Sequence, residues 1–147
     1  MRTKGTALYV AEPPASYLVR PPTVVDCSVL VALLFDEPWR DAAAQLVDGR
    51  ALHAPWLLDH EIASVAEKKR RAGVDNDVTA AAVAAYMQFD ITMHRTAPDA
   101  VLSLAATYML SAYDAAYLAL ASQLRAPLVT FDHKLGKAAV RHLGSLE

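Results

Sequence analysis

The 147-residue chain is short of the residues that hold many small folds together. Its one cysteine, Cys27, excludes a disulfide framework and a cysteine-rich zinc site. It has 5 glycines against 29 alanines, and because alanine is a strong helix former this balance argues against an all-β sandwich. No apolar run reaches the roughly 18–20 residues that a membrane-spanning helix needs. The sequence therefore indicates a helix-rich protein that does not enter a membrane.

The chain also lacks an excess of positive charge. It has 14 lysines and arginines against 16 aspartates and glutamates, for a formal net charge of −2. Proteins that hold nucleic acid by charge alone are usually strongly basic. If this protein acts on nucleic acid, it must do so through a local site.

Apolar side chains are what the sequence has in quantity, at 54% of all residues. A domain of this length buries roughly 68–70% of its unfolded surface and needs no disulfide or structural metal. Residues 1–22 are expected to form an N-terminal extension, because four of the eight prolines lie there. Glu12 and two prolines interrupt any signal-peptide core, so we expect a cytoplasmic protein. Residues 23–147 are expected to form one domain.

Short apolar runs and longer helical patterns alternate along that domain. Buried strands are expected at 23–26, 51–54, 91–93 and 127–132. Helices are expected at 29–35 with Ser28 as the N-cap, from 36 to about 49, and at 57–71, 75–89, 98–110 and 111–124, with a short one near the C-terminus. This alternation predicts an α/β fold with a central parallel sheet flanked by helices, an α/β/α sandwich.

Four acidic residues have reasons to meet at one edge of such a sheet. Asp26 and Asp132 end the first and last expected strands, and Glu61 and Asp114 lie within a turn or so of the start of two expected helices. Ligands of open α/β sheets bind outside the carboxyl ends of the strands. Gathered carboxylates repel one another unless a cation neutralises them, and oxygen ligands favour Mg²⁺ or Mn²⁺. Each acid also has an ordinary alternative role, as a helix cap or a partly exposed helical side chain.

Four segments in order resemble the motifs of PIN-domain ribonucleases, in particular the small VapC-like toxins of bacterial type II toxin–antitoxin systems. The segments are Val24-Val25-Asp26-Cys27-Ser28-Val29-Leu30, Pro55-Trp56-Leu57-Leu58-Asp59-His60-Glu61-Ile62, Ala112-Tyr113-Asp114-Ala115-Ala116-Tyr117-Leu118-Ala119-Leu120-Ala121 and Val129-Thr130-Phe131-Asp132-His133-Lys134-Leu135. Together they span about residues 23–142, and the family does not account for the extension.

The resemblance implies a PIN-like fold and a site in which Asp26, Glu61, Asp114 and Asp132 bind metal and act in catalysis. It implies that Ser28 and Thr130 support this site by hydrogen bonds to a carboxylate or to a water molecule on the metal. The implied reaction is hydrolysis of RNA phosphodiester bonds with Mg²⁺ or Mn²⁺. The implied partners are RNA, a cognate antitoxin whose C-terminal arm blocks the site, and a second copy of the chain.

Three further interpretations remain open at this point. Lys68, Lys69, Arg70 and Arg71 form either a phosphate-contacting patch or a solvated helix end. The protein is alternatively a catalytically silent binding module with the same fold. An aspartyl-phosphate phosphatase with Asp26 as nucleophile is disfavoured, because Ser28 stands where that chemistry needs a second acid.

Overall fold

The computed structural model describes residues 20–146. This part holds the strands β1 (Pro22–Val25), β2 (Ala51–Pro55), β3 (Ile91–His94) and β4 (Leu128–Val129). Its helices are α2 (Cys27–Leu34), α3 (Arg40–Val47), α4 (Leu57–Arg71), α5 (Asn76–Tyr86), α6 (Pro98–Tyr108), α7 (Ala112–Leu124) and α8 (His133–Leu143). The expected alternation of strands and helices is confirmed. The expected extension at residues 1–22 lies outside the described residues except for residues 20–22, of which Pro22 opens β1.

Three expected boundaries are wrong. The first helix begins at Cys27 with Asp26 as its N-cap, because the Asp26 carboxylate accepts the Ser28 N–H. The second helix begins at Arg40, since Asp36 adopts a left-handed φ of 50° and interrupts the helical path. The last strand has two residues instead of six, because only Leu128 and Val129 pair with β1.

All four strands are parallel, in the order β3-β2-β1-β4. The chain first builds the sheet outward from β1 through β2 to β3, and then returns to add β4 on the other side of β1. The strand order therefore reverses between β1 and β4. In open α/β sheets, ligands bind at this kind of switch point, outside the carboxyl ends of the strands.

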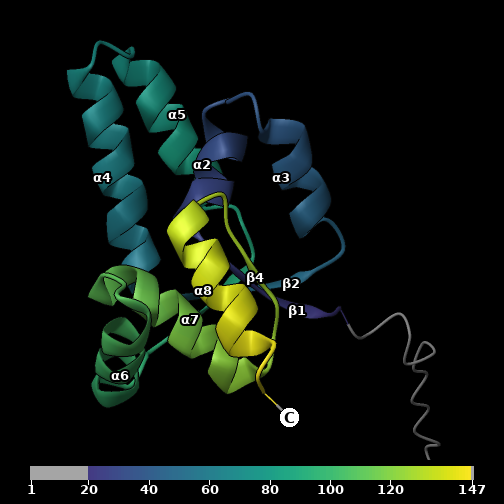
Figure 1. The fold of residues 1–147 in the computed structure, drawn as a ribbon. Coiled ribbons are helices and arrows are strands. Elements are labelled where there is room, and N and C mark those ends of the chain that lie inside the picture. The colour runs from purple at the N-terminus through teal and green to yellow at the C-terminus, as the bar shows by residue number, and fades with distance from the viewer. Residues whose placement is uncertain (1–19, 147) are drawn as a thin grey trace, which may run out of the picture.

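Helices cover both faces of the sheet (Figure 1). On one face α7 packs against β1, β2 and β4, with α6 and α8 against it. On the other face α2 contacts α3, α4 and α5. The result is the predicted α/β/α sandwich. None of the helices within residues 20–146 has the length and apolar character to cross a membrane.

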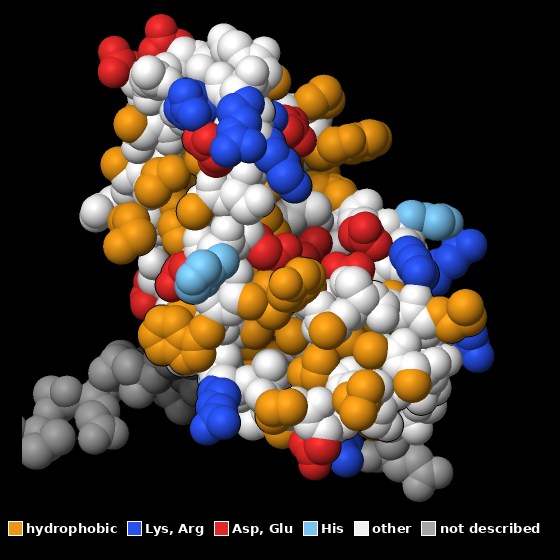
Figure 2. Space-filling model, turned by 90° about the vertical axis from the view of Figure 1, so that its left-hand side faces the viewer, with side chains coloured by type: hydrophobic (Ala, Val, Ile, Leu, Met, Phe, Trp, Pro, Cys, Tyr) orange, Lys and Arg blue, Asp and Glu red, His pale blue; other side chains and the backbone are white. Residues whose placement is uncertain are grey.

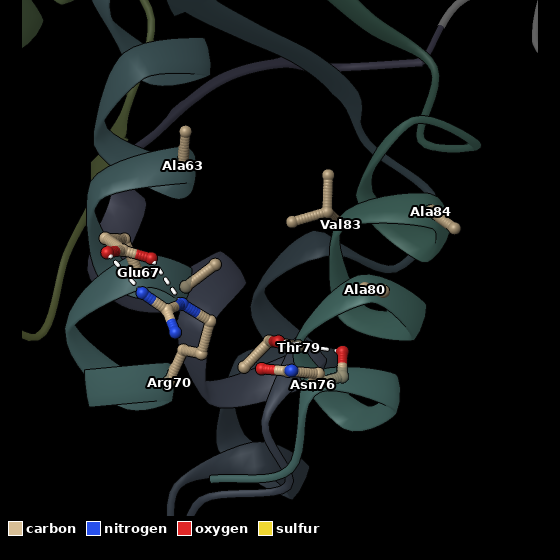
Figure 3. Close-up of a pocket in the computed structure, with 9 residues that line it drawn as sticks. Ala63, Glu67, Arg70, Asn76, Thr79, Ala80, Val83 and Ala84 are labelled. Carbon is tan, nitrogen blue, oxygen red and sulfur yellow. Dashed lines mark hydrogen bonds and ion pairs between the residues drawn. The ribbon is translucent and has the colours of Figure 1, made fainter. Parts of the chain in front are cut away.

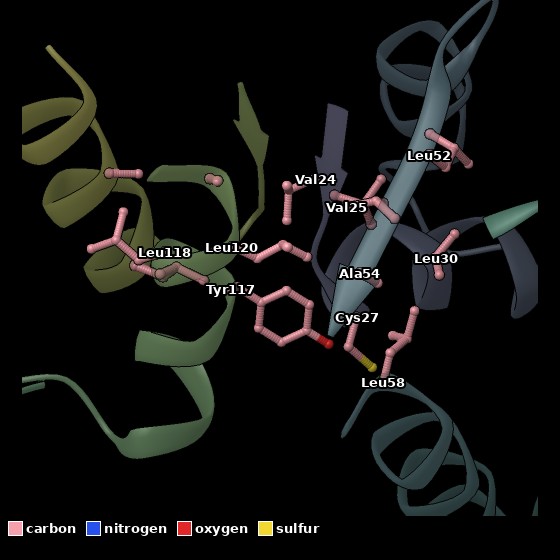
Figure 4. Close-up of a cluster of buried hydrophobic side chains, with 14 of the residues drawn as sticks. Val24, Val25, Cys27, Leu30, Leu52, Ala54, Leu58, Tyr117, Leu118 and Leu120 are labelled. Carbon is pink, nitrogen blue, oxygen red and sulfur yellow. The ribbon is translucent and has the colours of Figure 1, made fainter. Parts of the chain in front are cut away.

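The core forms on both sides of β1, whose Val24 and Val25 are fully buried. Figure 4 shows Val24 directed toward α7 and Val25 directed away from it, toward Leu52. Every residue of α7 from Ala115 to Ala121 is buried. Alanine, with its small side chain, fills four of those seven positions, so this helix can lie close to the sheet and to α6 and α8 at once. The alanine richness of the sequence thus serves a buried central helix.

Candidate active site

Asp26 lies directly after β1, where that strand gives way to α2. Only 5% of the residue is exposed. Its Oδ2 atom accepts hydrogen bonds from the Ser28 N–H at 3.3 Å, the Ser28 hydroxyl at 2.7 Å and the Thr130 hydroxyl at 2.8 Å. All the hydrogen bonds to this carboxylate from the described residues end on Oδ2. Asp26 is therefore held in one orientation, with Oδ1 left for another ligand.

The hydroxyls of Ser28 and Thr130 join the ends of β1 and β4. Ser28 Oγ accepts the Phe131 N–H at 2.9 Å, and Thr130 Oγ1 accepts the Asp132 N–H at 2.9 Å. Each hydroxyl thus donates to Asp26 and accepts from the backbone after β4. The supporting role expected for both residues agrees with these bonds.

Glu61 lies just over one turn into α4 and reaches across to α7. Its Oε1 atom accepts a 2.8 Å hydrogen bond from the hydroxyl of Tyr117, a fully buried residue. Burial raises the pKa of the Glu61 carboxyl to about 7, against the lowering effect of the Tyr117 hydroxyl; the charges of Asp26 and Asp114 raise it further. Glu61 therefore lies near enough to Asp26 and Asp114 for their charges to affect its pKa.

Asp114 and Asp132 complete the group. Asp114 lies in the first turn of α7, where its N–H donates to the Ser111 hydroxyl at 3.1 Å, as the expected capping pattern predicts. Burial raises the pKa of Asp114, and the charges of Asp132 and Asp26 add to the effect, while the Ser111 hydrogen bond and Lys134 oppose it. Asp132 is the N-cap of α8, with Oδ1 accepting the Leu135 N–H at 2.7 Å.

We call Asp26, Glu61, Asp114 and Asp132 the acid cluster. Each of the four is coupled through its charge to at least one other member. Figure 2 shows acidic side chains gathered in a hollow in the middle of one face, with lysine and arginine side chains above it and hydrophobic ones below. Asp26 and Asp132 are also the N-caps of α2 and α8, so these two acids cap a helix and belong to the acid cluster at the same time.

The donor chemistry of the acid cluster fits a hard divalent cation, because all four side chains offer carboxylate oxygens, the ligands that such an ion prefers. Among residues 20–146, no group of three or more His, Cys, Asp or Glu side chains is arranged to hold a metal ion. Mg²⁺ usually keeps several water ligands and is bound through one or two carboxylates, so it does not require three protein ligands. PIN-domain ribonucleases in general depend on divalent metals.

Two residues next to the acid cluster were not identified from the sequence as part of a site. Tyr117 holds Glu61, and its position three residues after Asp114 on a helix is a signal that could have indicated this. Burial raises the pKa of the Cys27 thiol to about 12, with the charges of Glu61 and Asp26 adding to the effect. The thiol therefore stays protonated and is no nucleophile at neutral pH.

Three of the four basic residues at the end of α4 form ion pairs, with two acids between them. Arg70 and Arg71 both pair with Glu67, at 2.7 and 2.8 Å, and Figure 3 shows the Glu67–Arg70 pair in the groove between α4 and α5. Lys69 pairs with Glu37 at 2.9 Å. Lys68 is exposed, with no ion pair to any residue that the structure describes. The run keeps a net positive charge, because its four cations meet only two acids, Glu37 and Glu67.

Comparison with known proteins gives matches over most of the chain. The family model described as the PIN domain matches residues 23–141. A VapC ribonuclease of Mycobacterium bovis and ribonuclease VapC9 of Mycobacterium tuberculosis are each 34% identical to the chain over 118 residues, which cover 76% of this chain and 87% of each relative.

Solved structures with the same fold include PAE2754 from Pyrobaculum aerophilum, with a TM-score of 0.64 at 22% identity, covering 85% of this chain and 88% of that one. They also include Mycobacterium tuberculosis VapC20, described as a toxin that cleaves the sarcin–ricin loop. Its TM-score is 0.60 at 17% identity, and the match covers 79% of this chain and 94% of VapC20. The fold and the sequence matches agree, and the chain belongs to the PIN-domain family and, within it, to the VapC ribonucleases.

Proposed function

We propose that this protein is a toxin endoribonuclease that hydrolyses RNA phosphodiester bonds with Mg²⁺ or Mn²⁺ at the acid cluster. The observation that carries the proposal is that Asp26 follows β1, Asp132 follows β4 across the switch point of the sheet, and Glu61 and Asp114 lie early in α4 and α7. Membership of the VapC ribonucleases supports RNA as the substrate.

In this mechanism carboxylates of the acid cluster would hold the cation, and neighbouring hydroxyls hold two of these acids in place. Ser28 and Thr130 hold Asp26 through Oδ2, and Tyr117 holds Glu61 through Oε1. When bound, a divalent cation lowers the pKa of a water molecule and offsets the charge of the phosphoryl transition state. Hydrolysis would form a bond from a water oxygen to phosphorus and break the bond from phosphorus to the leaving ribose oxygen. The proton lost by the water would go to solvent, and the leaving oxygen would take up a proton.

The proposal also explains how a protein with a net charge of −2 can act on a polyanion. Without a cation, the carboxylates of the acid cluster repel a phosphate, because both groups carry negative charge. With a cation, the local charge at the site becomes less negative, and the phosphate can approach. Metal and substrate binding are therefore expected to be linked.

The test is RNA cleavage by the purified full-length chain. EDTA should abolish cleavage, and added Mg²⁺ or Mn²⁺ should restore it. Asp26→Ala and Asp114→Asn should each abolish cleavage while the protein still unfolds cooperatively, because each removes one of the proposed cation ligands. Asp48→Asn is the matched control, since Asp48 is exposed and lies before β2, at the opposite edge of the sheet.

Metal-dependent cleavage that is undiminished in the two folded variants would contradict the site assignment. A wild-type chain that cleaves no RNA with either cation, after removal of any bound antitoxin, would instead support the catalytically silent binding module.

The partners are part of the proposal. VapC toxins pair with antitoxins, and we expect a cognate antitoxin to cover the acid cluster with a C-terminal arm. A short protein encoded directly upstream should suppress cleavage when it is added to the toxin. We also expect a homodimer, measurable by light scattering. We also propose that Lys68, Lys69, Arg70 and Arg71 contact RNA phosphates; Lys68 is the one of the four with no ion pair to any residue within 20–146.

A further inference from the structure

We propose that a single RNA strand crosses the acid cluster between two open pockets, with one nucleobase against Tyr113 and the backbone phosphates along Lys137 and Arg141. Each pocket shares one carboxylate with the cluster: Glu61 lines the first and Asp132 lines the second. This path rests on the proposed function, and it specifies which residues bind the RNA at the same site.

The first pocket is small and carries an exposed aromatic ring. It has a volume of about 240 Å³, and Leu57, His60, Glu61, Ser64 and Tyr113 line it. Tyr113 is 69% exposed, although tyrosine is a large side chain with much apolar area to bury. The volume is below the roughly 300–1,000 Å³ of small-molecule sites, and so suits a fragment such as one nucleobase. Because Tyr113 directly precedes Asp114, a base stacked on its ring lies beside the acid cluster.

The second pocket is larger and carries positive charge. It has a volume of about 590 Å³ and lies along α8, with Phe131, Asp132, His133, Lys137 and Arg141 among its lining residues. His133, Lys137 and Arg141 follow one another at intervals of four residues, so they share one face of the helix. All three are exposed, and no ion pair joins Lys137 or Arg141 to an acid among residues 20–146.

The cations of α8 contrast with the basic run of α4, three of whose four members are paired with Glu37 or Glu67. Lys137 and Arg141 therefore keep their charge for a polyanion, one helical turn apart, and Arg141 is additionally placed 5.8 Å from the ring of Tyr108. Trp39 is 62% exposed, and its ring centre lies 6.1 Å from that of Phe131, which lines the second pocket. Aromatic rings and cations along a groove are what single-stranded nucleic acid binds.

The path requires an unstacked strand. A base can enter the Tyr113 pocket only after it leaves its neighbours in the stack, and this costs least in loops and single strands. We therefore expect cleavage in single-stranded segments, with one of the two nucleotides beside the cut bond in contact with Tyr113.

The first test combines a protein variant with an altered substrate. Tyr113→Ala should lower kcat/KM on a short single-stranded RNA by about 5- to 150-fold, as expected for one lost base stack. Tyr113→Phe should retain the activity, because it keeps the ring. An RNA that is abasic on one side of the cut bond should be cleaved equally slowly by the wild type and by Tyr113→Ala. If Tyr113→Ala lowers kcat/KM on each abasic RNA by the same factor as on the intact RNA, Tyr113 does not bind a base, and this part of the path is wrong.

The second test measures the salt dependence of KM. Lys137→Gln and Arg141→Gln should each raise KM and reduce the slope of log KM against log salt by about 0.7, the value for one lost phosphate contact on a single strand. Arg50→Gln is the matched control, because Arg50 is exposed and precedes β2, at the opposite edge of the sheet. Unchanged slopes for both α8 variants would overturn the phosphate contacts.

The outcomes separate the path from the proposed function. If the wild type cleaves RNA with metal while the Tyr113 and α8 variants behave like Arg50→Gln, the path is wrong and the nuclease assignment stands. If the wild type cleaves no RNA, both are overturned.

Discussion

The raised pKa of Glu61 predicts that the acid cluster costs the protein stability at neutral pH. The pKa of this carboxyl is about 7 in the folded chain against an ordinary value of 4.5, because burial and the neighbouring acids disfavour its charge. The folded state therefore binds more protons than the unfolded state between these two values. In the metal-free wild type, the free energy of unfolding should fall as the pH rises through this window.

Glu61→Gln isolates this effect, since glutamine keeps the shape and an oxygen that accepts from Tyr117 but carries no charge. A pKa difference of this size corresponds to at most about 3.4 kcal/mol, at about 1.36 kcal/mol per pH unit. Solvent reaches the partly exposed Glu61 side chain and weakens the effect, so we expect a gain of about 1–2 kcal/mol for the variant at pH 8. Near pH 4.5 the gain should be close to zero, because Glu61 is mostly protonated in the folded state.

The assay is urea unfolding of both proteins in EDTA at pH 4.5, 6 and 8. Subtraction of the wild-type curve from the variant curve largely removes the contributions of groups that titrate in both proteins. Mg²⁺ at pH 8 should reduce the difference in the free energy of unfolding between the variant and the wild type, because a cation relieves charge repulsion at residue 61 only in the wild type. A variant that is no more stable than the wild type at pH 8, or that gains equally at pH 4.5, would refute the reasoning.

Two further predictions follow from single contacts. Thr130→Val removes the 2.8 Å hydrogen bond to Asp26 and should lower kcat/KM for RNA cleavage by about 10- to 100-fold. Thr130→Ser keeps the hydroxyl and should retain activity. Equal losses of kcat/KM in both variants would show that the hydroxyl is not responsible. Met109→Gly should raise the free energy of unfolding by about 0.5–1 kcal/mol, because Met109 is exposed and has a φ of 54° that glycine adopts freely. Met87→Gly is the control, because Met87 has a φ of −64°, which does not favour glycine. Urea unfolding of this variant should show a loss of about 0.5–1 kcal/mol in the free energy of unfolding. A gain in the free energy of unfolding for both variants would contradict the explanation.

Much of the fold could be predicted because it depends on short-range patterns. The helix expected at 57–71 is α4 with the same bounds, and Ser111 caps α7 as its spacing to Asp114 suggested. The position of each acid along its strand or helix could also be predicted, because it depends only on neighbouring residues in the sequence. By contrast, the expected N-cap at Ser28 failed because the Ser28 hydroxyl is used by Asp26 and by the Phe131 N–H, and residue 131 lies far along the chain.

The same division explains the basic residues. The sequence alone could not show that Lys69 pairs with Glu37, 32 residues away, or that Lys137 and Arg141 line a pocket that includes Asp132. It could show only that Lys68–Arg71 is a concentrated run of charge. The availability of a charge for a ligand depends on which acid the fold brings next to it.

By itself the sequence determined the alternation of strands and helices, the parallel sheet, and four acids at strand ends and early helical turns, because hydrophobic period and capping chemistry act over a few residues. Only the tertiary structure decided that β4 pairs with β1. That pairing joins Thr130 to Asp26 across 104 residues, and the packing of α7 against the sheet brings Tyr117 to Glu61 across 56. Strand order follows from burying both faces of the sheet at once, a requirement of the whole chain that no local segment contains.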